Sequence, residues 1–199
     1  MTMRWAIGFA VLALAATGAR AAERGEAIFA GGCFWCEETA FEGVPGVQAV
    51  ISGYTGGTKK QPTYDEVSSG STGHAESVRV VFDPAKISYA RLLDIFWHSI
   101  DPLSAGGQFC DRGTQYRSAI FYRDDAQRRA AEESKRKIQA QLKQPIATEI
   151  AAAGEFYPAE EYHQDFFRKN PVRYLSYRTG CGRDRRLKEL WGAAAVTSH

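Results

Sequence analysis

The stretch AIFAGGCFWCEET, residues 27–39, contains the features from which we predict both the fold and a reactive site. An apolar run over residues 26–31 predicts a short buried strand, and residues 34–42 predict a helix. The glycine and proline that follow are typical of a helix end. A strand that passes through two glycines into a helix places Cys33 at the helix N-terminus.

Working outward from this stretch, alternation of apolar residues and clusters of turn-forming residues predict the other elements. Strands are expected over residues 46–57, 74–84, 116–123 and 145–150. Helices are expected over residues 88–100, 124–142, 158–169 and 183–192, and long loops over residues 58–73 and 101–115. Short, partly alternating strands favour an α+β fold over a doubly wound parallel sheet. We therefore expect a two-layer sandwich of helices on a mixed, largely antiparallel sheet with a ferredoxin-like core.

Composition is ordinary for a globular chain. The 199 residues are 44% hydrophobic, which is enough for one core, and we expect a single domain over residues 22–199 with a partly irregular C-terminal segment. The net charge of +2 gives no reason to expect nucleic acid or a membrane surface as partner. A basic cluster, RDRRLK at residues 183–188, is expected to be a solvated face rather than a phosphate-binding patch.

The N-terminal residues have the layout of a secretory signal peptide. Arg4 precedes the apolar run of residues 6–18, and the small-x-small sequence at residues 19–21 is typical of a cleavage site. The run is shorter than the ~20 residues that a transmembrane helix needs, although an uncleaved anchor is the alternative. We predict cleavage after Ala21 and export to the periplasm or the medium, without stable membrane association.

The four cysteines, Cys33, Cys36, Cys110 and Cys181, could form two structural disulfides in an exported protein. A Cys-x-x-Cys pair can also be half of a metal site, a redox disulfide, or one nucleophile beside a bystander. No histidine pair has ligand spacing, and Glu37 stands where haem attachment needs histidine. We therefore expect a redox or nucleophilic cysteine, with no metal and no bound cofactor.

Cys33 has the sequence context of a nucleophile. The unpaired N–H groups and the positive dipole end at a helix N-terminus stabilise a thiolate, which would lower the cysteine pKa from about 8.5. The alternative is a structural cysteine at a strand–helix corner. Phe34 and Trp35 could likewise be core residues or the walls of an apolar pocket that accepts a methyl or thioether group.

Glu76 lies in the clearest predicted strand, HAESVRVVFDP at residues 74–84. Period-two alternation puts it on the same face as Val78 and Val80, where desolvation would keep the carboxyl protonated and able to donate a proton. A wet strand end is the alternative.

Three further polar residues lie in or beside the two long loops. Tyr64 and Tyr116 can donate hydrogen bonds to a polarised oxygen, although each could be an ordinary packing residue. Asp111 could equally be a turn residue.

Several motifs together closely resemble the peptide methionine sulfoxide reductase A family, over about residues 26–171. They are GGCFWCEE, PTYDEV, TGHAESVRVVFDP, FCDRGTQYRSAIF and YPAEEYHQDFFRKNP. The resemblance implies that Cys33 attacks the sulfoxide sulfur and that Glu76 gives a proton to the sulfoxide oxygen. It also implies that Tyr64, Tyr116 and Asp111 hold this oxygen.

The resemblance further implies the substrate and the reductant. Phe34 and Trp35 would form the pocket for the substrate methyl group. The substrate would be the S epimer of methionine sulfoxide, free or in oxidised proteins, so that the enzyme repairs damage from oxidative stress. Cys33 would become a sulfenic acid, a second cysteine would condense with it, and a thioredoxin-type dithiol would reduce the disulfide. The expected oligomeric state is a monomer.

The identity of the second cysteine stays open between two positions. Cys181, in YRTGCGRD, matches the place where the family carries a resolving cysteine on a mobile C-terminal segment, and we favour it over Cys36 and over Cys110. Two rival functions explain part of the pattern. One is a thioredoxin-type oxidoreductase, which leaves Glu76 unused, and the other is a disulfide-stapled binding domain.

Overall fold

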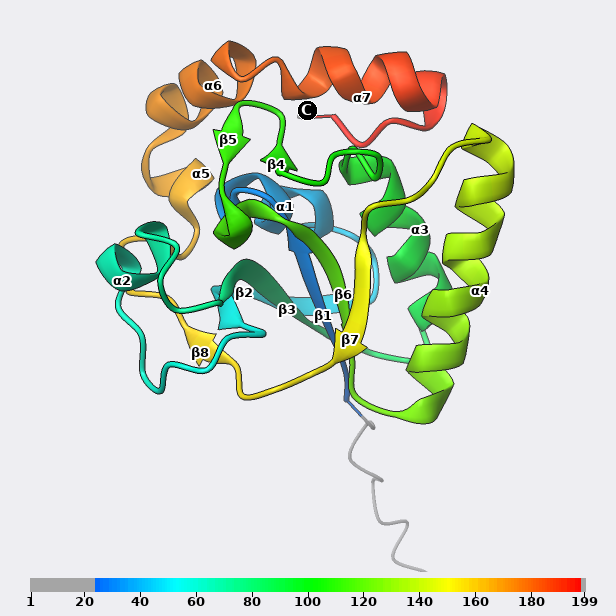
Figure 1. Ribbon diagram of the computed structural model, residues 1–199, viewed down its shortest axis with the longest axis horizontal. Helices are drawn as coiled ribbons and strands as arrows, with labels where there is room; N and C mark the ends of the chain where they lie inside the picture. The colour runs from blue at the N-terminus through cyan, green and yellow to red at the C-terminus, as the bar shows by residue number, and fades with distance from the viewer. Residues whose placement is uncertain (1–23, 198–199) are drawn as a thin grey trace, which may run out of the picture.

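The computed structural model describes residues 24–197, and these form a mixed six-stranded sheet with helices packed against it (Figure 1). The sheet order is β7-β6-β1-β3-β2-β8. The strands are β1 (Gly25–Gly31), β2 (Val47–Thr55), β3 (Ala75–Phe82), β6 (Ser118–Tyr122), β7 (Glu149–Ala152) and β8 (Tyr157–Pro158). Neighbouring strands are antiparallel except β6 and β7. The predicted signal peptide, residues 1–21, lies outside the described residues.

The helices confirm the expected α+β class. They are α1 (Phe34–Phe41), α2 (Tyr64–Ser68), α3 (Tyr89–Ser99), α4 (Asp125–Leu142), α5 (Phe166–Lys169), α6 (Pro171–Gly180) and α7 (Arg183–Trp191). Shorter elements are β4 (Gly107–Gln108), β5 (Asp111–Arg112), and the 3₁₀ turns η1 (Thr114–Tyr116) and η2 (Gly192–Ala194). The order β1-α1-β2-β3-α3-β6, with sheet neighbours β6-β1-β3-β2, is the expected ferredoxin-like core.

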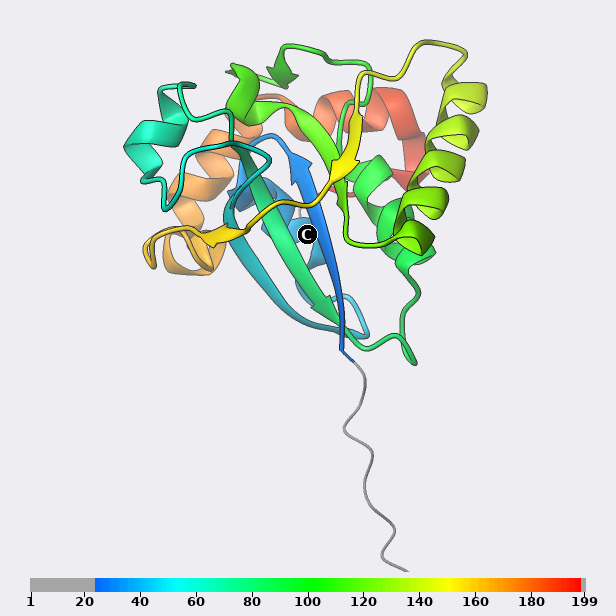
Figure 2. The same cartoon turned by 60° about the horizontal axis from the view of Figure 1, so that its bottom comes forward.

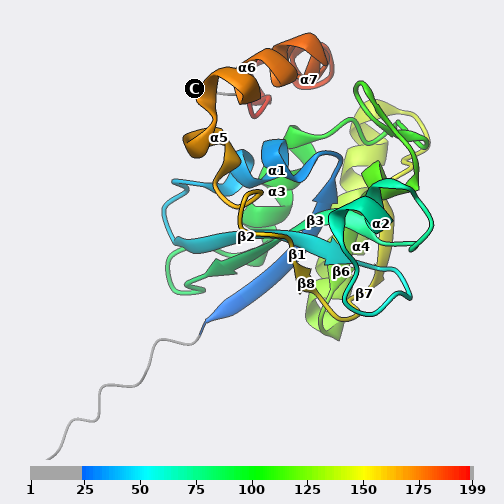
Figure 3. The same ribbon diagram turned by 90° about the vertical axis from the view of Figure 1, so that its left-hand side faces the viewer.

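Helices α1 and α3 lie together on one face of the sheet, and the C-terminal helices α6 and α7 lie beyond them (Figure 3). Helix α4 packs beside α3 (Figure 2). Among residues 24–197, no helix combines the length and the apolar character that a membrane crossing requires.

The main core lies between the sheet and this helical layer. Phe29 of β1 stacks on Phe41 of α1 at 5.3 Å between ring centroids and on Phe96 of α3 at 5.0 Å. A smaller cluster around Ile28 and Phe121 covers the other face of the sheet, packed against the segment that follows β7. Because β1 buries residues on both faces, its sequence is a continuous apolar run without alternation.

Three segments differ from the sequence-based expectation. The loop of residues 58–73 contains α2, which a capping box between Thr63 and Glu66 stabilises. The predicted strand at 145–150 is shifted to β7, because parallel pairing with β6 runs from Glu149 onward. The predicted helix at 158–169 is helical only in α5, since Asp165 adopts a left-handed conformation with φ 52°.

The C-terminal segment is more regular than predicted. Residues 171–180 form α6, with a proline at its first position, where a missing N–H costs no hydrogen bond. Gly182, with φ 66°, separates α6 from α7. In Figure 1, α6 and α7 run along the top of the molecule, the end of the sheet where β1 passes into α1.

Candidate functional site

The turn between β1 and α1 is built from two tightly packed glycines. A Cβ at Gly31 would collide with the carboxylate of Glu37, and a Cβ at Gly32 would lie 2.6 Å from the side chain of Gln108. Gly32 also has φ 88°, which favours glycine. The two glycines thus make room for two side chains of the protein, which fix the backbone that leads to Cys33.

Cys33 is the N-cap residue of α1, as predicted, and its carbonyl accepts hydrogen bonds from the N–H groups of Cys36 at 3.1 Å and Glu37 at 3.2 Å. The residue is only 6% exposed. Burial raises the pKa of the Cys33 thiol, and the Cys36 and Glu76 side chains raise it further. The expected lowering is therefore not found, because desolvation outweighs the helix N-terminus. The pKa of Cys36 is lowered instead, first by a hydrogen bond from Cys33 and then by nearby arginines.

Glu76 lies on the buried face of β3, as predicted, and is 2% exposed. Its Oε2 accepts a hydrogen bond from the backbone N–H of Phe34 at 3.1 Å, which places the carboxyl beside the first turn of α1. Burial raises the pKa of Glu76 to about 8, against the lowering effect of this hydrogen bond. The carboxyl is therefore mostly protonated at neutral pH and can donate a proton beside Cys33.

Aromatic rings surround this pair. Trp35 stacks on Phe166 of α5 at 3.7 Å, and its Nε1–H donates to Nδ1 of His163 at 3.0 Å. Phe34 packs against Tyr54 of β2 and against His163. Burial lowers the pKa of His163 to about 4, so the ring is neutral and Nδ1 can accept. Phe34 is buried and Trp35 half-buried, so of the two rings the indole is the one that keeps some solvent-accessible surface.

The three polar residues from the long loops, Tyr64, Tyr116 and Asp111, lie near Cys33 and Glu76. Tyr64 at the start of α2 and Tyr116 at the end of η1 share a side-chain hydrogen bond. Burial raises the pKa of both phenols, that of Tyr64 to about 12, so both remain hydrogen-bond donors. Asp111 of β5 accepts a hydrogen bond from the hydroxyl of Tyr177 on α6, and Tyr177 also reaches the Cys33 sulfur.

Glu160 holds two of the tyrosines in place. Its two carboxylate oxygens accept from the Tyr54 hydroxyl at 2.8 Å and from the backbone N–H of Tyr64 at 2.9 Å. These contacts explain why the chain at Glu160 leaves the expected helical path: its carboxylate turns inward to tie β8 to α2.

The four cysteines divide into two pairs. Cys110 and Cys181 form a disulfide with 4.8 Å between their Cα atoms, whereas Cys33 and Cys36 are free and buried. The structure thus brings Cys36, and not Cys181, beside Cys33. The preference for Cys181 as first partner of Cys33 rested on a mobile tail, but α6 and the disulfide hold Cys181 against β5. Cys110, Asp111 and Cys181 have sulfur and oxygen atoms within 4.8 Å of one another, but both sulfurs are already bonded.

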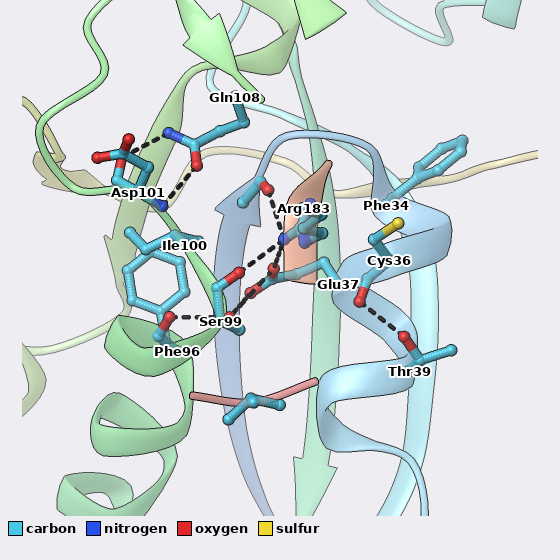
Figure 4. Close-up of polar contacts among 12 residues, drawn as sticks. Phe34, Cys36, Glu37, Thr39, Phe96, Ser99, Ile100, Asp101, Gln108 and Arg183 are labelled. Carbon is cyan, nitrogen blue, oxygen red and sulfur yellow. Dashed lines mark hydrogen bonds and ion pairs between the residues drawn. The ribbon is translucent and has the colours of Figure 1, made fainter. Parts of the chain in front are cut away.

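The basic cluster 183–188 is not the uniformly solvated face that we expected. Arg185 is exposed, but the side chain of Arg183 is 2% exposed and points inward to α1 (Figure 4). Its Nη2 donates to the Gly31 carbonyl at 3.0 Å and lies 3.3 Å from Glu37 Oε2. Composition cannot distinguish this arginine from its neighbours, because only the packing of α7 against α3 selects it.

Sequence reasoning also missed Tyr54, His163 and Tyr177. His163 and Tyr177 come from segments far from Cys33 along the chain, and each of the three is one aromatic residue among many. Tyr54 lies directly opposite Glu76 in the pairing of β2 with β3, a register that only the structure shows.

Comparison with known proteins gives one consistent result. A family model described as peptide methionine sulfoxide reductase matches residues 25–195. Peptide methionine sulfoxide reductase MsrA of Bacillus licheniformis is 54% identical over 174 residues, which are 86% of this chain and 96% of the relative.

Two solved structures extend the comparison. Reduced Mxr1 from Saccharomyces cerevisiae is 33% identical with a TM-score of 0.73, covering 76% of this chain and 88% of that chain. Mxr1 in complex with Trx2 is 23% identical in its alignment, with a TM-score of 0.53, and covers 76% of this chain and 91% of that chain.

Proposed function

The chain belongs to the peptide methionine sulfoxide reductase family, and we propose that it reduces the S epimer of methionine sulfoxide, free or in proteins, to methionine. The observation that carries this proposal is the buried carboxyl of Glu76 beside the first turn of α1, next to the Cys33 thiol. A protonated acid, a nucleophilic sulfur and an aromatic pocket are the groups that this reaction needs.

In the proposed reaction the Cys33 sulfur attacks the sulfoxide sulfur. Glu76 donates its proton to the sulfoxide oxygen and receives the thiol proton of Cys33. The oxygen passes to the Cys33 sulfur, so that a thiol and a sulfoxide become a sulfenic acid and a thioether. Tyr64 and Tyr116 hold the oxygen through their hydroxyl groups, and Asp111 holds it through water or through Tyr177.

The substrate methyl group lies in the pocket that Phe34 and Trp35 form. Trp35 is well suited to this role because its ring cannot turn: Phe166 covers one face and His163 accepts from Nε1. The apolar surface favours a methyl thioether, and the oxygen-binding hydroxyl groups on the other side distinguish the two sulfoxide epimers.

For the recycling step we propose Cys36 as the first partner of Cys33. The sulfenic acid of Cys33 and the thiol of Cys36 condense to a disulfide and water. The sulfur of Cys36 lies in the next turn of the same helix, close enough to hydrogen-bond with Cys33. Cys181 then acts later, with Cys110, as the pair that exchanges with the buried disulfide and meets the external reductant.

The proposed reductant is a thioredoxin-type dithiol, so the reaction includes no bound cofactor and no metal. The exposed position of Cys110 supports this route, since a protein dithiol can reach it and cannot reach the buried Cys33 and Cys36.

We also propose export and repair of oxidised proteins as the biological setting. The layout of residues 1–21 supports cleavage near Ala21 and a periplasmic or secreted protein without stable membrane association. An intact mass that still includes these residues in the exported protein would contradict the cleavage. The proposed oligomeric state is a monomer.

The test of the activity uses racemic methionine sulfoxide with dithiothreitol and chromatographic separation of the epimers. We expect loss of the S epimer alone and no reaction with the Cys33→Ser variant. Consumption of neither epimer would refute the proposal. Reduction of insulin disulfides by the protein would then favour the thioredoxin-type oxidoreductase.

A further inference from the structure

Arg183 is the residue that joins the C-terminal helices to the Cys33 turn. From the start of α7 its Nη2 donates to the carbonyl of Ser99 at 2.8 Å as well as to that of Gly31, two residues before Cys33 (Figure 4). The guanidinium also lies over the ring of Phe109 at 4.4 Å. An arginine on a helix surface normally keeps its charge in water, so this buried placement needs an explanation in the site.

The charge of Arg183 is only partly matched by its carboxylate partner. Glu37 is fully buried, and burial raises its pKa to about 7 although Arg183 lowers it. The Ser99 hydroxyl lies 3.4 Å from both Glu37 oxygens. Because arginine stays charged at every relevant pH, a partly protonated Glu37 leaves positive charge in the interior near Cys36.

Arg178 on α6 differs in this respect. Its Nε and Nη2 donate to Asp184 Oδ1 at 2.9 Å and 2.6 Å, so a partly exposed carboxylate balances its charge. Of the two arginines near Cys36, Arg183 is therefore the one whose charge is less fully balanced by a carboxylate.

We propose that Arg183 is a positioning residue for both thiols, because its guanidinium holds the Gly31 carbonyl, two residues before Cys33, and places a buried positive charge against α1, the helix that carries Cys36. This inference rests on the proposed function and deepens it, since it determines which sulfur attacks the sulfenic acid. The Cys36 thiolate attacks the Cys33 sulfur, the S–O bond breaks, and the hydroxide that leaves takes up a proton to become water.

Other charged or titratable groups also face Cys36, and the test must separate them from Arg183. From α1 they are Cys33 and Glu37, from α6 Tyr174, Tyr177 and Arg178, from β5 Asp111, and from β3 Glu76. Asp111 raises the pKa of Cys36, and the two arginines lower it. Cys36 in turn raises the pKa values of Glu37 and Glu76.

The test titrates Cys36 by its ultraviolet thiolate absorbance in the full chain with Cys33→Ser and an intact Cys110–Cys181 disulfide. Serine keeps a hydrogen-bond donor at position 33, and Cys36 is then the only free thiol. We expect Arg183→Gln to raise the Cys36 midpoint by about one pH unit or more, as for loss of a neighbouring opposite charge. Glu37→Gln should shift the midpoint the other way, since it removes the competing carboxylate.

Arg185→Gln is the matched control, because it removes the same charge from the same helix at a side chain that is 81% exposed. Its midpoint should equal that of the parent. Arg183→Lys, which keeps the charge, should restore most of the shift. Arg183→Met, which keeps the aliphatic stem without the charge, serves if Arg183→Gln fails to fold.

A second measurement uses Cys33 intact and follows Cys33–Cys36 disulfide formation after one turnover with methionine sulfoxide. Formation should slow about tenfold in Arg183→Gln below the Cys36 midpoint, in proportion to the thiolate fraction. If Arg183→Gln and Glu37→Gln only lower thermal stability and leave the Cys36 midpoint unchanged, Arg183 is structural and the proposal is wrong. Failure of the proposed activity would show separately, as absence of methionine in the parent protein.

Discussion

The two cysteine pairs of this protein differ in almost every physical respect. Cys33 and Cys36 are three residues apart, buried and free, whereas Cys110 and Cys181 are 71 residues apart and bonded, with Cys110 exposed. The pair that is close in sequence is the one left unbonded, and the distant pair is the one that is bonded. Chemistry on a small substrate suits the first environment, and exchange with another protein suits the second.

The comparison also shows what controls a thiol at a helix N-terminus. Cys33 occupies the N-cap position, yet its pKa is raised because the site is dry. Cys36, one turn further on, has the lowered pKa because a donor thiol and two arginines face it. Specific partners and burial therefore outweigh the helix dipole here.

The largest expected effect separates the chemistry of the two pairs. Glu76→Gln removes the proton donor beside Cys33, and we expect reduction of the S epimer to fall by about 100-fold or more. Reduction of the Cys110–Cys181 disulfide by thioredoxin, measured by thiol release, should not change. Glu133→Gln, an exposed carboxylate on α4, is the control. Equal activity of Glu76→Gln and the parent would remove Glu76 from the mechanism.

The next effect concerns the electron donor. A variant with both Cys110→Ser and Cys181→Ser should retain activity with dithiothreitol but lose about tenfold or more with thioredoxin, because the buried disulfide is inaccessible to a protein dithiol. Steady-state assays with the two donors measure the ratio. If both donors lose activity equally, the outer pair serves the fold alone.

The same double variant also tests how much each cysteine pair contributes to the free energy of unfolding. The Cys110–Cys181 disulfide closes a loop of 71 residues, and its removal should cost roughly 2–4 kcal/mol of unfolding free energy. Cys36→Ser breaks no covalent bond in the free-thiol state and should cost less. Denaturant titrations of the oxidised parent and both variants provide the test, and a larger loss for Cys36→Ser would contradict it.

The smallest expected effect concerns Tyr177, whose hydroxyl links the two cysteine pairs. The Tyr177 hydroxyl contacts both Cys33 and Asp111, the neighbour of Cys110. Tyr177→Phe should lower kcat/KM about three- to tenfold, the size of one lost hydrogen bond, with little change in thermal stability. Tyr162→Phe, at a residue that is 58% exposed, should have no effect. An unchanged kcat/KM in Tyr177→Phe would show that the link has no role.

The fold could be predicted where local pattern and tertiary role agree. The alternation in β3 correctly placed Glu76 on the buried face, and the helix expected over residues 88–100 is α3, which Ser88 caps by accepting a hydrogen bond from the Arg91 N–H at 3.2 Å. Prediction failed where a distant partner sets the conformation. Glu160 turns inward to two tyrosines and interrupts a helix that local propensity favours.

The sequence by itself determined the α+β class, the position of Cys33 at a helix start and the burial of Glu76, because these depend on periodicity and on neighbours along the chain. Only the tertiary structure decided which cysteines pair, which arginine is buried and which thiol has the lowered pKa. Those outcomes depend on distances between segments more than 70 residues apart and on local exclusion of water, which no local pattern records.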